Sequence, residues 1–236
     1  MSPALRSTAF ASFTLAALAA ALAGCASPHA SAGPAAHAAE STRHTPKEAT
    51  QLLVEGNARF VAGKGQHSRQ DPGRRSELAT SQHPFAVILG CADSRTSPEI
   101  LFDQGLGDLF VVREAGNVLD DHALGSIEYA AEHLHSPLIV VLGHERCGAV
   151  AAARDTVASN GHAEGHIASL VDAIRPAVEA SAGKDAEATC KANVRNMVRA
   201  LETCEPLLKH MVEKHEVAVV GAYYDLDTGA VTFLPD

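Results

Sequence analysis

Two stretches of the sequence decide the fold: FAVILGCADSR at 85–95 and LIVVLGHERCG at 138–148. Each begins with a continuous run of apolar and β-branched residues, without a polar residue that could face water. Such runs are typical of strands in a parallel sheet that is covered on both faces. Each run then gives way to charged and sulfur-bearing residues, which indicates that the strand ends there and a loop with reactive groups begins.

Two further apolar runs, at 109–112 and 217–220, predict the other strands of this sheet. Helical stretches separate the four runs, at 122–135, 164–180 and 187–215, the last interrupted by Pro206. This alternation predicts an α/β fold with a mostly parallel central sheet of four strands flanked by helices. A short run at 230–233 follows the turn 227–229, so we expect an antiparallel edge strand there.

A helix is expected at the start of the folded domain. Thr45 is a preferred N-cap residue, and Pro46 follows at the first helical position. An apolar stripe continues as far as Phe60, and Gly63 is expected to end the helix. The domain is therefore predicted to span residues 45–236.

The first 24 residues resemble a bacterial lipoprotein signal peptide. Arg6 is their only charged residue, and the apolar stretch 13–23 is too short to span a bilayer comfortably. The sequence LAGC at 22–25 resembles the lipobox, in which the cysteine is acylated and becomes the new N-terminus. Cys25 is therefore expected to be a lipid anchor, and an ordinary signal peptide with a chance cysteine is the alternative.

The sequence after Cys25 bears on location. Residues 25–44 are rich in Ala, Ser, Pro and His without apolar periodicity, which predicts a flexible tether. Ala26 occupies the position where an inner-membrane retention signal has Asp. We therefore expect a periplasmic protein that is anchored to the outer membrane.

Composition indicates a small-molecule ligand. The formal net charge is −9, and the chain has no long run of Lys and Arg that could follow a phosphate backbone. Nucleic acid is therefore not expected as a partner. The absence of Trp and the presence of only seven Phe and three Tyr provide few stacking surfaces for bases or sugars.

The strand ends carry a possible metal site, because parallel strands bring their carboxyl ends to one edge. Cys91 follows one strand, and His144 and Cys147 follow another. Two cysteines and one histidine suit zinc and leave one coordination position for water. Asp93 is the nearest candidate for a fourth ligand. Taken alone, an H-x-x-C motif is weak evidence, and a cysteine at a strand end often serves packing.

Cys190 and Cys204 are the remaining cysteines. If 188–204 forms one helix, they lie about 21 Å apart along it, which is beyond the reach of a disulfide. We expect both to be buried apolar residues.

Two longer segments resemble the signature regions of β-carbonic anhydrases. They are CADSRTSPEILFDQGLGDLFVVREAGN at 91–117 and GSIEYAAEHLHSPLIVVLGHERCGAV at 125–150. They contain C-x-D-x-R and H-x-x-C in the order and spacing of that family, and the likeness extends over about 45–236. The resemblance implies reversible hydration of carbon dioxide to bicarbonate and a proton by zinc-bound hydroxide, in a homodimer or homotetramer.

The resemblance also implies roles for particular residues. Three residues would hold one zinc ion per subunit: Cys91, His144 and Cys147. Asp93 and Arg95 would form the dyad beside it. Gln82 matches a glutamine that donates a hydrogen bond to substrate, in some cases from the partner subunit.

Two positions depart from parts of the family. Ile88 stands where one branch has a Trp that helps to bind regulatory bicarbonate, and Ala115 stands where some relatives have a bulkier residue in the substrate pocket. Two other functions stay open. One is hydrolysis of carbonyl sulfide or carbon disulfide on the same fold. The other is a non-catalytic zinc-binding or thiol-redox lipoprotein, in which Asp93 and Arg95 would have no role.

Overall fold

The computed structural model describes residues 44–235. The expected signal peptide, Cys25 and the tether up to residue 43 lie outside the described residues. A five-stranded sheet has the order β2-β1-β3-β4-β5. Its strands are β1 (Ala86–Gly90), β2 (Leu109–Arg113), β3 (Leu138–His144), β4 (Ala218–Tyr224) and β5 (Val231–Phe233). The first four are parallel, and β5 pairs antiparallel with β4 at the edge, so the predicted α/β fold is confirmed.

The residues of the central strands alternate between two hydrophobic layers. Ala86 and Ile88 of β1 belong to a cluster on one face of the sheet, whereas Val87 and Leu89 belong to a cluster on the other. Every residue of β1 and β3 is buried. This explains why these strands are continuously apolar, because neither face of them meets water.

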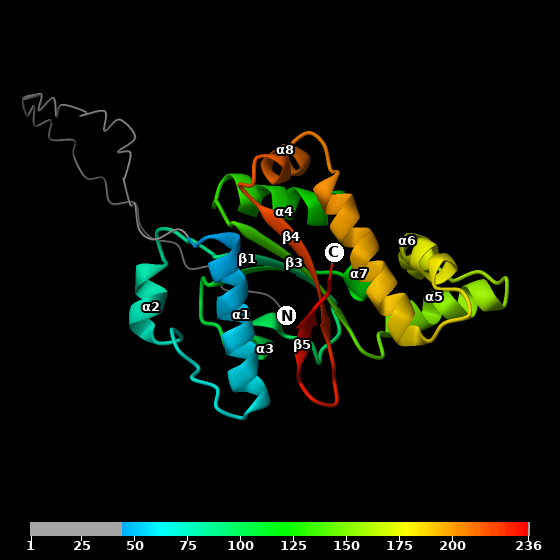
Figure 1. Ribbon diagram of the computed structural model, residues 1–236, viewed down its shortest axis with the longest axis horizontal. Coiled ribbons are helices and arrows are strands. Elements are labelled where there is room, and N and C mark those ends of the chain that lie inside the picture. The colour runs from blue at the N-terminus through cyan, green and yellow to red at the C-terminus, as the bar shows by residue number, and fades with distance from the viewer. Residues whose placement is uncertain (1–43, 236) are drawn as a thin grey trace, which may run out of the picture. The chain divides into compact units, whose positions relative to one another are not determined.

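Helices cover both faces (Figure 1). The first face packs against α1 (Pro46–Val61) and α3 (Pro98–Leu101). The second packs against α4 (Asp121–Glu132), α7 (Ala186–Glu202) and α8 (Leu208–Glu213). Among residues 44–235, no helix combines the length and the apolarity needed to cross a membrane.

A third hydrophobic cluster lies beyond the carboxyl ends of the strands. It is formed where α5 (Gly148–Ala158) packs beside α6 (Ile167–Ala180) and α7 (Figure 1). Val150 and Ile174 are buried in this cluster together with Cys91, Cys147 and Cys190. Two of the expected metal ligands, Cys91 and Cys147, therefore pack among apolar side chains.

Most of the predicted helices are observed. Thr45 caps α1 in a reciprocal capping box with Glu48. The stretch predicted at 187–215 is two helices, because α7 ends at Glu202 and α8 begins after Pro206. No helical range was predicted for α5, and three short elements were not predicted either: α2 (Pro72–Glu77), α3 and the 3-10 turn η1 (Ala115–Asn117).

Cys190 and Cys204 are both free thiols. Cys190 is buried, as predicted, and burial raises the pKa of its thiol to about 11. The same prediction is only partly right for Cys204, which is half-buried. Cys204 is less buried because it lies just past the C-terminal end of α7, outside the part of the helix that packs on the sheet.

Candidate metal centre

Three loops meet at the carboxyl edge of the sheet. β1 and β2 remain joined beyond their ends, where the amide of Ala92 donates to the carbonyl oxygen of Glu114 at 3.2 Å. The loop after β1 also reaches the loop after β3, since the Arg95 guanidinium donates to the carbonyl oxygen of Arg146 at 3.4 Å. The convergence expected from the parallel order is therefore observed.

Cys91, His144 and Cys147 form a compact, buried cluster at this edge. Each offers one ligand atom, and these atoms all lie within 4.8 Å of one another. The ring Nδ1 of His144 lies 2.8 Å from the carbonyl oxygen of Glu145. Because a carbonyl can only accept, Nδ1 carries the proton and the lone pair of Nε2 is free. Nε2 is buried and has no hydrogen-bond partner among the described residues.

The surroundings stabilise one of the two sulfur atoms, that of Cys91, as a thiolate. A hydrogen bond between their side chains lowers the pKa of Cys91 and raises that of Cys147. The amides of Gly116 and Asp93 also donate to Cys91 Sγ, at 3.2 and 3.4 Å. Two sulfurs and an unprotonated imidazole nitrogen in a small buried space form a donor set that fits a metal ion.

Asp93 lies beside this cluster and is paired with Arg95. Nε of Arg95 donates to Oδ1 at 2.9 Å and Nη2 donates to Oδ2 at 2.7 Å, so the pair is bidentate. These bonds hold the pKa of Asp93 well below its usual range, which keeps the carboxylate ionised. Asp93 Oδ2 is 4.0 Å from Nε2 of His144.

Arg113 and Thr96 hold the loop that carries Cys91 and Asp93. Arg113 donates from Nε to the carbonyl oxygen of Cys91 at 2.9 Å and from Nη2 to that of Asp93 at 2.6 Å. The buried Thr96 hydroxyl lies within hydrogen-bond distance of the same two oxygens. The sequence predicted no role for either residue. Arg113 pairs with Gly90 in the register of β2 on β1, and that register was the signal that could have identified it.

The β4–β5 hairpin holds the H-x-x-C segment. The amide of Glu145 donates to the carbonyl oxygen of Tyr224 at 2.9 Å, and the amide of Leu226 donates to Oε2 of Glu145 at 3.1 Å. Arg146 forms a bidentate pair with Asp227, at 3.0 and 2.7 Å. Both residues between His144 and Cys147 are thus tied to the hairpin.

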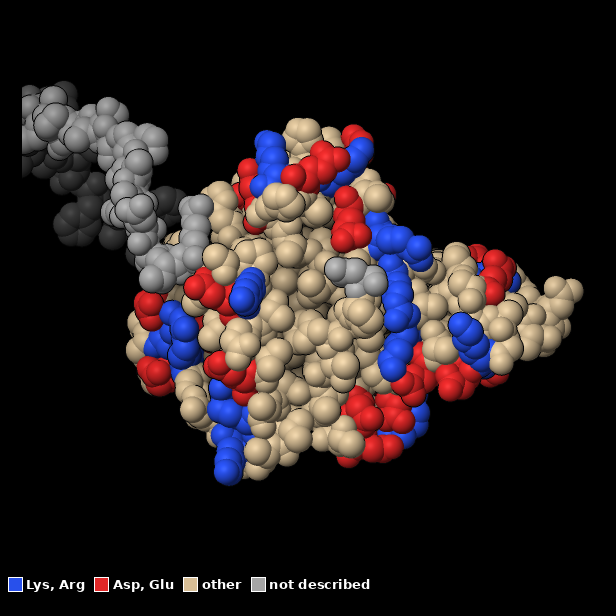
Figure 2. Space-filling model, viewed as in Figure 1, with Lys and Arg blue, Asp and Glu red and all other residues tan. Residues whose placement is uncertain are grey.

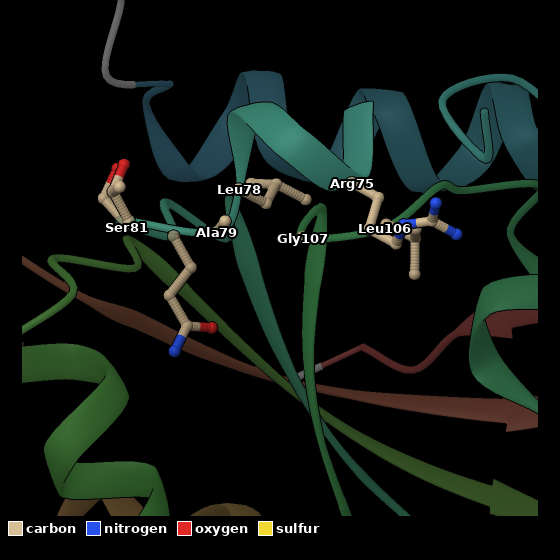
Figure 3. A pocket seen from close by; sticks show the side chains of 8 residues that line it. Arg75, Leu78, Ala79, Ser81, Leu106 and Gly107 are labelled. Carbon is tan, nitrogen blue, oxygen red and sulfur yellow. The ribbon is translucent and has the colours of Figure 1, made fainter. Parts of the chain in front are cut away.

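Gln82 lies away from the cluster of Cys91, His144 and Cys147 in the same chain. It precedes β1 whereas Cys91 follows it, so the two residues lie at opposite edges of the sheet. The exposed Gln82 lines a pocket of about 490 Å³ (Figure 3). The pocket is also lined by Arg75, Leu78, Ser81, Leu106 and Gly107.

The two departures from the family pattern also have definite positions. Ile88 is completely buried in β1 and packs in the first hydrophobic layer. Ala115 begins η1, directly before the Gly116 amide that donates to Cys91.

Comparison with known proteins identifies the family. The family model described as carbonic anhydrase matches residues 86–231. Over 187 residues the chain is 43% identical to carbonic anhydrase 2 of Mycobacterium tuberculosis, covering 78% of this chain and 90% of that protein. It is 42% identical over 190 residues to the carbonic anhydrase of Mycolicibacterium smegmatis, covering 79% and 92%.

Solved structures show the same fold. One of them comes from a study of two tetrameric β-carbonic anhydrases of Sordaria macrospora. It has a TM-score of 0.63 and 24% identity, over 79% of this chain and 97% of that one. A β-carbonic anhydrase of Coccomyxa also shares the fold, with a TM-score of 0.60 and 27% identity over 77% of this chain and 84% of that one. Together with the matched family model and the identity to the mycobacterial enzymes, this assigns the chain to the β class of the carbonic anhydrase family.

Proposed function

We propose that this carbonic anhydrase uses one Zn²⁺ ion per subunit, held by Cys91, His144 and Cys147, to convert carbon dioxide reversibly to bicarbonate and a proton. The observation that carries the proposal is the buried Nε2 of His144. It has no hydrogen-bond partner within residues 44–235, and it lies within 4.8 Å of two sulfurs. A zinc ion at these ligands would lower the pKa of a water molecule and so supply the nucleophile for carbon dioxide.

Asp93 is the residue we propose to orient that water. Its ionised carboxylate can accept a hydrogen bond from the water and so direct the oxygen lone pair toward the carbon of the substrate. Arg95 keeps the carboxylate ionised and fixes its direction through two parallel hydrogen bonds. Because Oδ2 is 4.0 Å from His144 Nε2, a carboxylate released by Arg95 could turn to the metal position and act as a fourth ligand instead.

We also propose that the enzyme is a homodimer or a homotetramer and that Gln82 contributes to the site of a partner subunit. Gln82 is exposed at the edge of the sheet opposite to its own metal cluster. Apolar side chains are exposed on α1 and near the Gln82 pocket, including Val54, Val61 and Leu106. Burial of such side chains favours association of subunits. The Sordaria macrospora enzymes are described as tetrameric.

The cellular location is part of the same proposal. The lipobox-like sequence ending at Cys25 and the Ala that follows it support a periplasmic enzyme anchored by lipid to the outer membrane. An anchor formed by several acyl chains on one cysteine would hold the enzyme stably at the membrane.

No observation favours either of the other two functions. In a zinc-storage or thiol-redox protein the Asp93–Arg95 pair would have no purpose, and a redox activity would survive removal of zinc. Parallel assays of the purified protein with carbon dioxide, carbonyl sulfide and carbon disulfide test the substrate. We expect turnover of carbon dioxide to exceed that of both sulfur compounds, and faster turnover of either sulfur compound would contradict the proposal.

A further inference from the structure

Cys91 Sγ receives a hydrogen bond from outside its own loop. One of its two amide donors, Asp93, lies only two residues away on the same loop. The other, Gly116, lies in η1 after β2 and donates at 3.2 Å. The orientation of the Gly116 backbone therefore decides whether this second donor points at the sulfur.

Gly116 would be mobile if nothing restrained it. Its φ is 75°, in the left-handed region, where glycine moves freely but other residues are strained. A Cβ added at Gly116 would lie 2.7 Å from Cδ1 of Ile174 and 3.1 Å from Cβ of Ala149. Side chains of α5 and α6 therefore fill the space beside Gly116.

Asn193 of α7 restrains the backbone of Gly116 through a hydrogen bond. Its Nδ2 donates to the carbonyl oxygen of Gly116 at 2.8 Å, across 77 positions in the sequence. The outer face of α7 carries Lys191, Arg195 and Arg199, and Figure 2 shows basic side chains gathered along this helix. Asn193 lies instead on the inner face of α7, where it is 1% exposed beside the buried Val194.

The buried side-chain amide of Asn193 is energetically costly among apolar neighbours. Burying an amide costs free energy unless its polar atoms are hydrogen-bonded, and Oδ1 of Asn193 has no partner among the described residues. An apolar side chain of similar volume would avoid this cost. The bond from Nδ2 to Gly116 is therefore the contribution that distinguishes asparagine from leucine at this position.

We propose that Asn193 is a positioning residue for the metal ligand Cys91. It fixes the backbone of Gly116 so that the Gly116 amide stays on Cys91 Sγ. An amide donor withdraws electron density from a thiolate and fixes its direction, and such outer contacts typically change metal affinity by about 10- to 100-fold. This inference rests on the proposed function, because it requires a metal at Cys91.

The decisive variant is Asn193→Leu, which removes the donor but keeps a side chain of similar size. Because the buried carbonyl oxygen of Gly116 loses its donor, we expect the folded variant to melt somewhat below the wild-type temperature without metal. We also expect it to bind zinc about 10- to 100-fold more weakly in competition with a chelator. With cobalt in place of zinc, its sulfur-to-metal charge-transfer band should shift. Asn196→Leu is the matched control on the same helix, because the Asn196 side chain accepts its hydrogen bond from Arg199, one turn further along α7.

The outcomes separate the possible roles. If Asn193→Leu does not fold, Asn193→Ser, which is too short to reach Gly116, is judged by the same criteria. Wild-type zinc affinity and an unchanged cobalt spectrum in a folded Asn193 variant would overturn the proposal, as would failure of both variants to fold. If the wild-type protein itself binds no zinc, the proposed function fails rather than this inference alone.

Discussion

Arg95 and Asp93, two positions apart on the loop after β1, are joined by two parallel hydrogen bonds between their side chains, at 2.9 and 2.7 Å. The same carboxylate lies 4.0 Å from Nε2 of His144. Asp93 therefore has two possible partners, the guanidinium and a metal at the cluster. The pair with Arg95 leaves a coordination position for water, and loss of the pair would let Asp93 occupy it.

Replacing Arg95 by Ala tests this relationship. We expect zinc content to be unchanged, since Arg95 is not a ligand, whereas hydration of carbon dioxide should fall by at least about 100-fold because Asp93 is no longer directed. Metal analysis and stopped-flow rates measure the two effects. Arg175→Ala is the control, because Arg175 also pairs with an aspartate, Asp172 at 3.3 Å, but through one contact on the surface of α6. Near-normal turnover of the Arg95 variant at every pH would show that the pair is structural.

The hydration rate should rise from a low value near neutral pH toward mildly alkaline pH. Two thiolates offset the charge of zinc, so its water should ionise less readily than at a site of three histidines, where the pKa is about 7. Arg95 keeps the pKa of Asp93 below its unfolded value of 3.8. Above pH 3.8 the ionised pair therefore makes its full contribution to the free energy of unfolding. That contribution is lost only as the pH falls through the lower pKa of Asp93 in the folded state.

The alkaline rise consequently cannot come from ionisation of Asp93. Initial rates over roughly pH 6.5 to 9 in buffers of constant ionic strength measure the profile. A rate that is constant or falling over this range would contradict the expected ionisation of water at a site with two thiolates.

Replacing Cys147 by Ser should abolish zinc binding and activity together. The three proposed ligands come from the ends of β1 and β3, so a metal held by them should also join these loops and contribute to folding. We expect a lower melting temperature than that of zinc-loaded wild-type protein. Cys204→Ser is the control, since this half-buried thiol contacts Glu128 and lies outside the cluster. Full zinc occupancy in the Cys147 variant would remove Cys147 from the ligand set.

The proposed lipid anchor gives a prediction for the protein in its host. Full-length protein should fractionate with the membrane, and a form that begins at residue 26 should be soluble, because acyl chains on Cys25 would provide the attachment. Cys25→Ser should lose both the membrane association and the lipid-dependent increase in mass. Retention of both by this variant would refute the lipobox interpretation.

The sheet and the central site could be predicted from the sequence because they depend on local signals. Continuous apolar runs identify buried parallel strands, and such strands share one carboxyl edge, so Cys91 and His144 were expected to meet. By contrast, the proximity of Gly90 and Arg113 can be inferred only when the register of β2 on β1 is known. The bond from Asn193 to Gly116 depends on which face of α7 turns inward.

The short helices escaped prediction for a different reason. α2 has six residues and α3 has four, which is less than two turns, so neither can display a complete apolar stripe. The expected role of Gln82 in the site of a partner subunit cannot be judged from a single chain, because it requires a second subunit.

The central claim is that zinc at Cys91, His144 and Cys147 hydrates carbon dioxide. The most direct test is stopped-flow hydration by the purified protein before and after removal of zinc, followed by return of one equivalent. We predict activity far above the uncatalysed rate, its loss on removal of the metal, and its recovery in proportion to the zinc that is bound. Hydration no faster than the buffer blank in protein that carries one zinc per subunit would contradict this account.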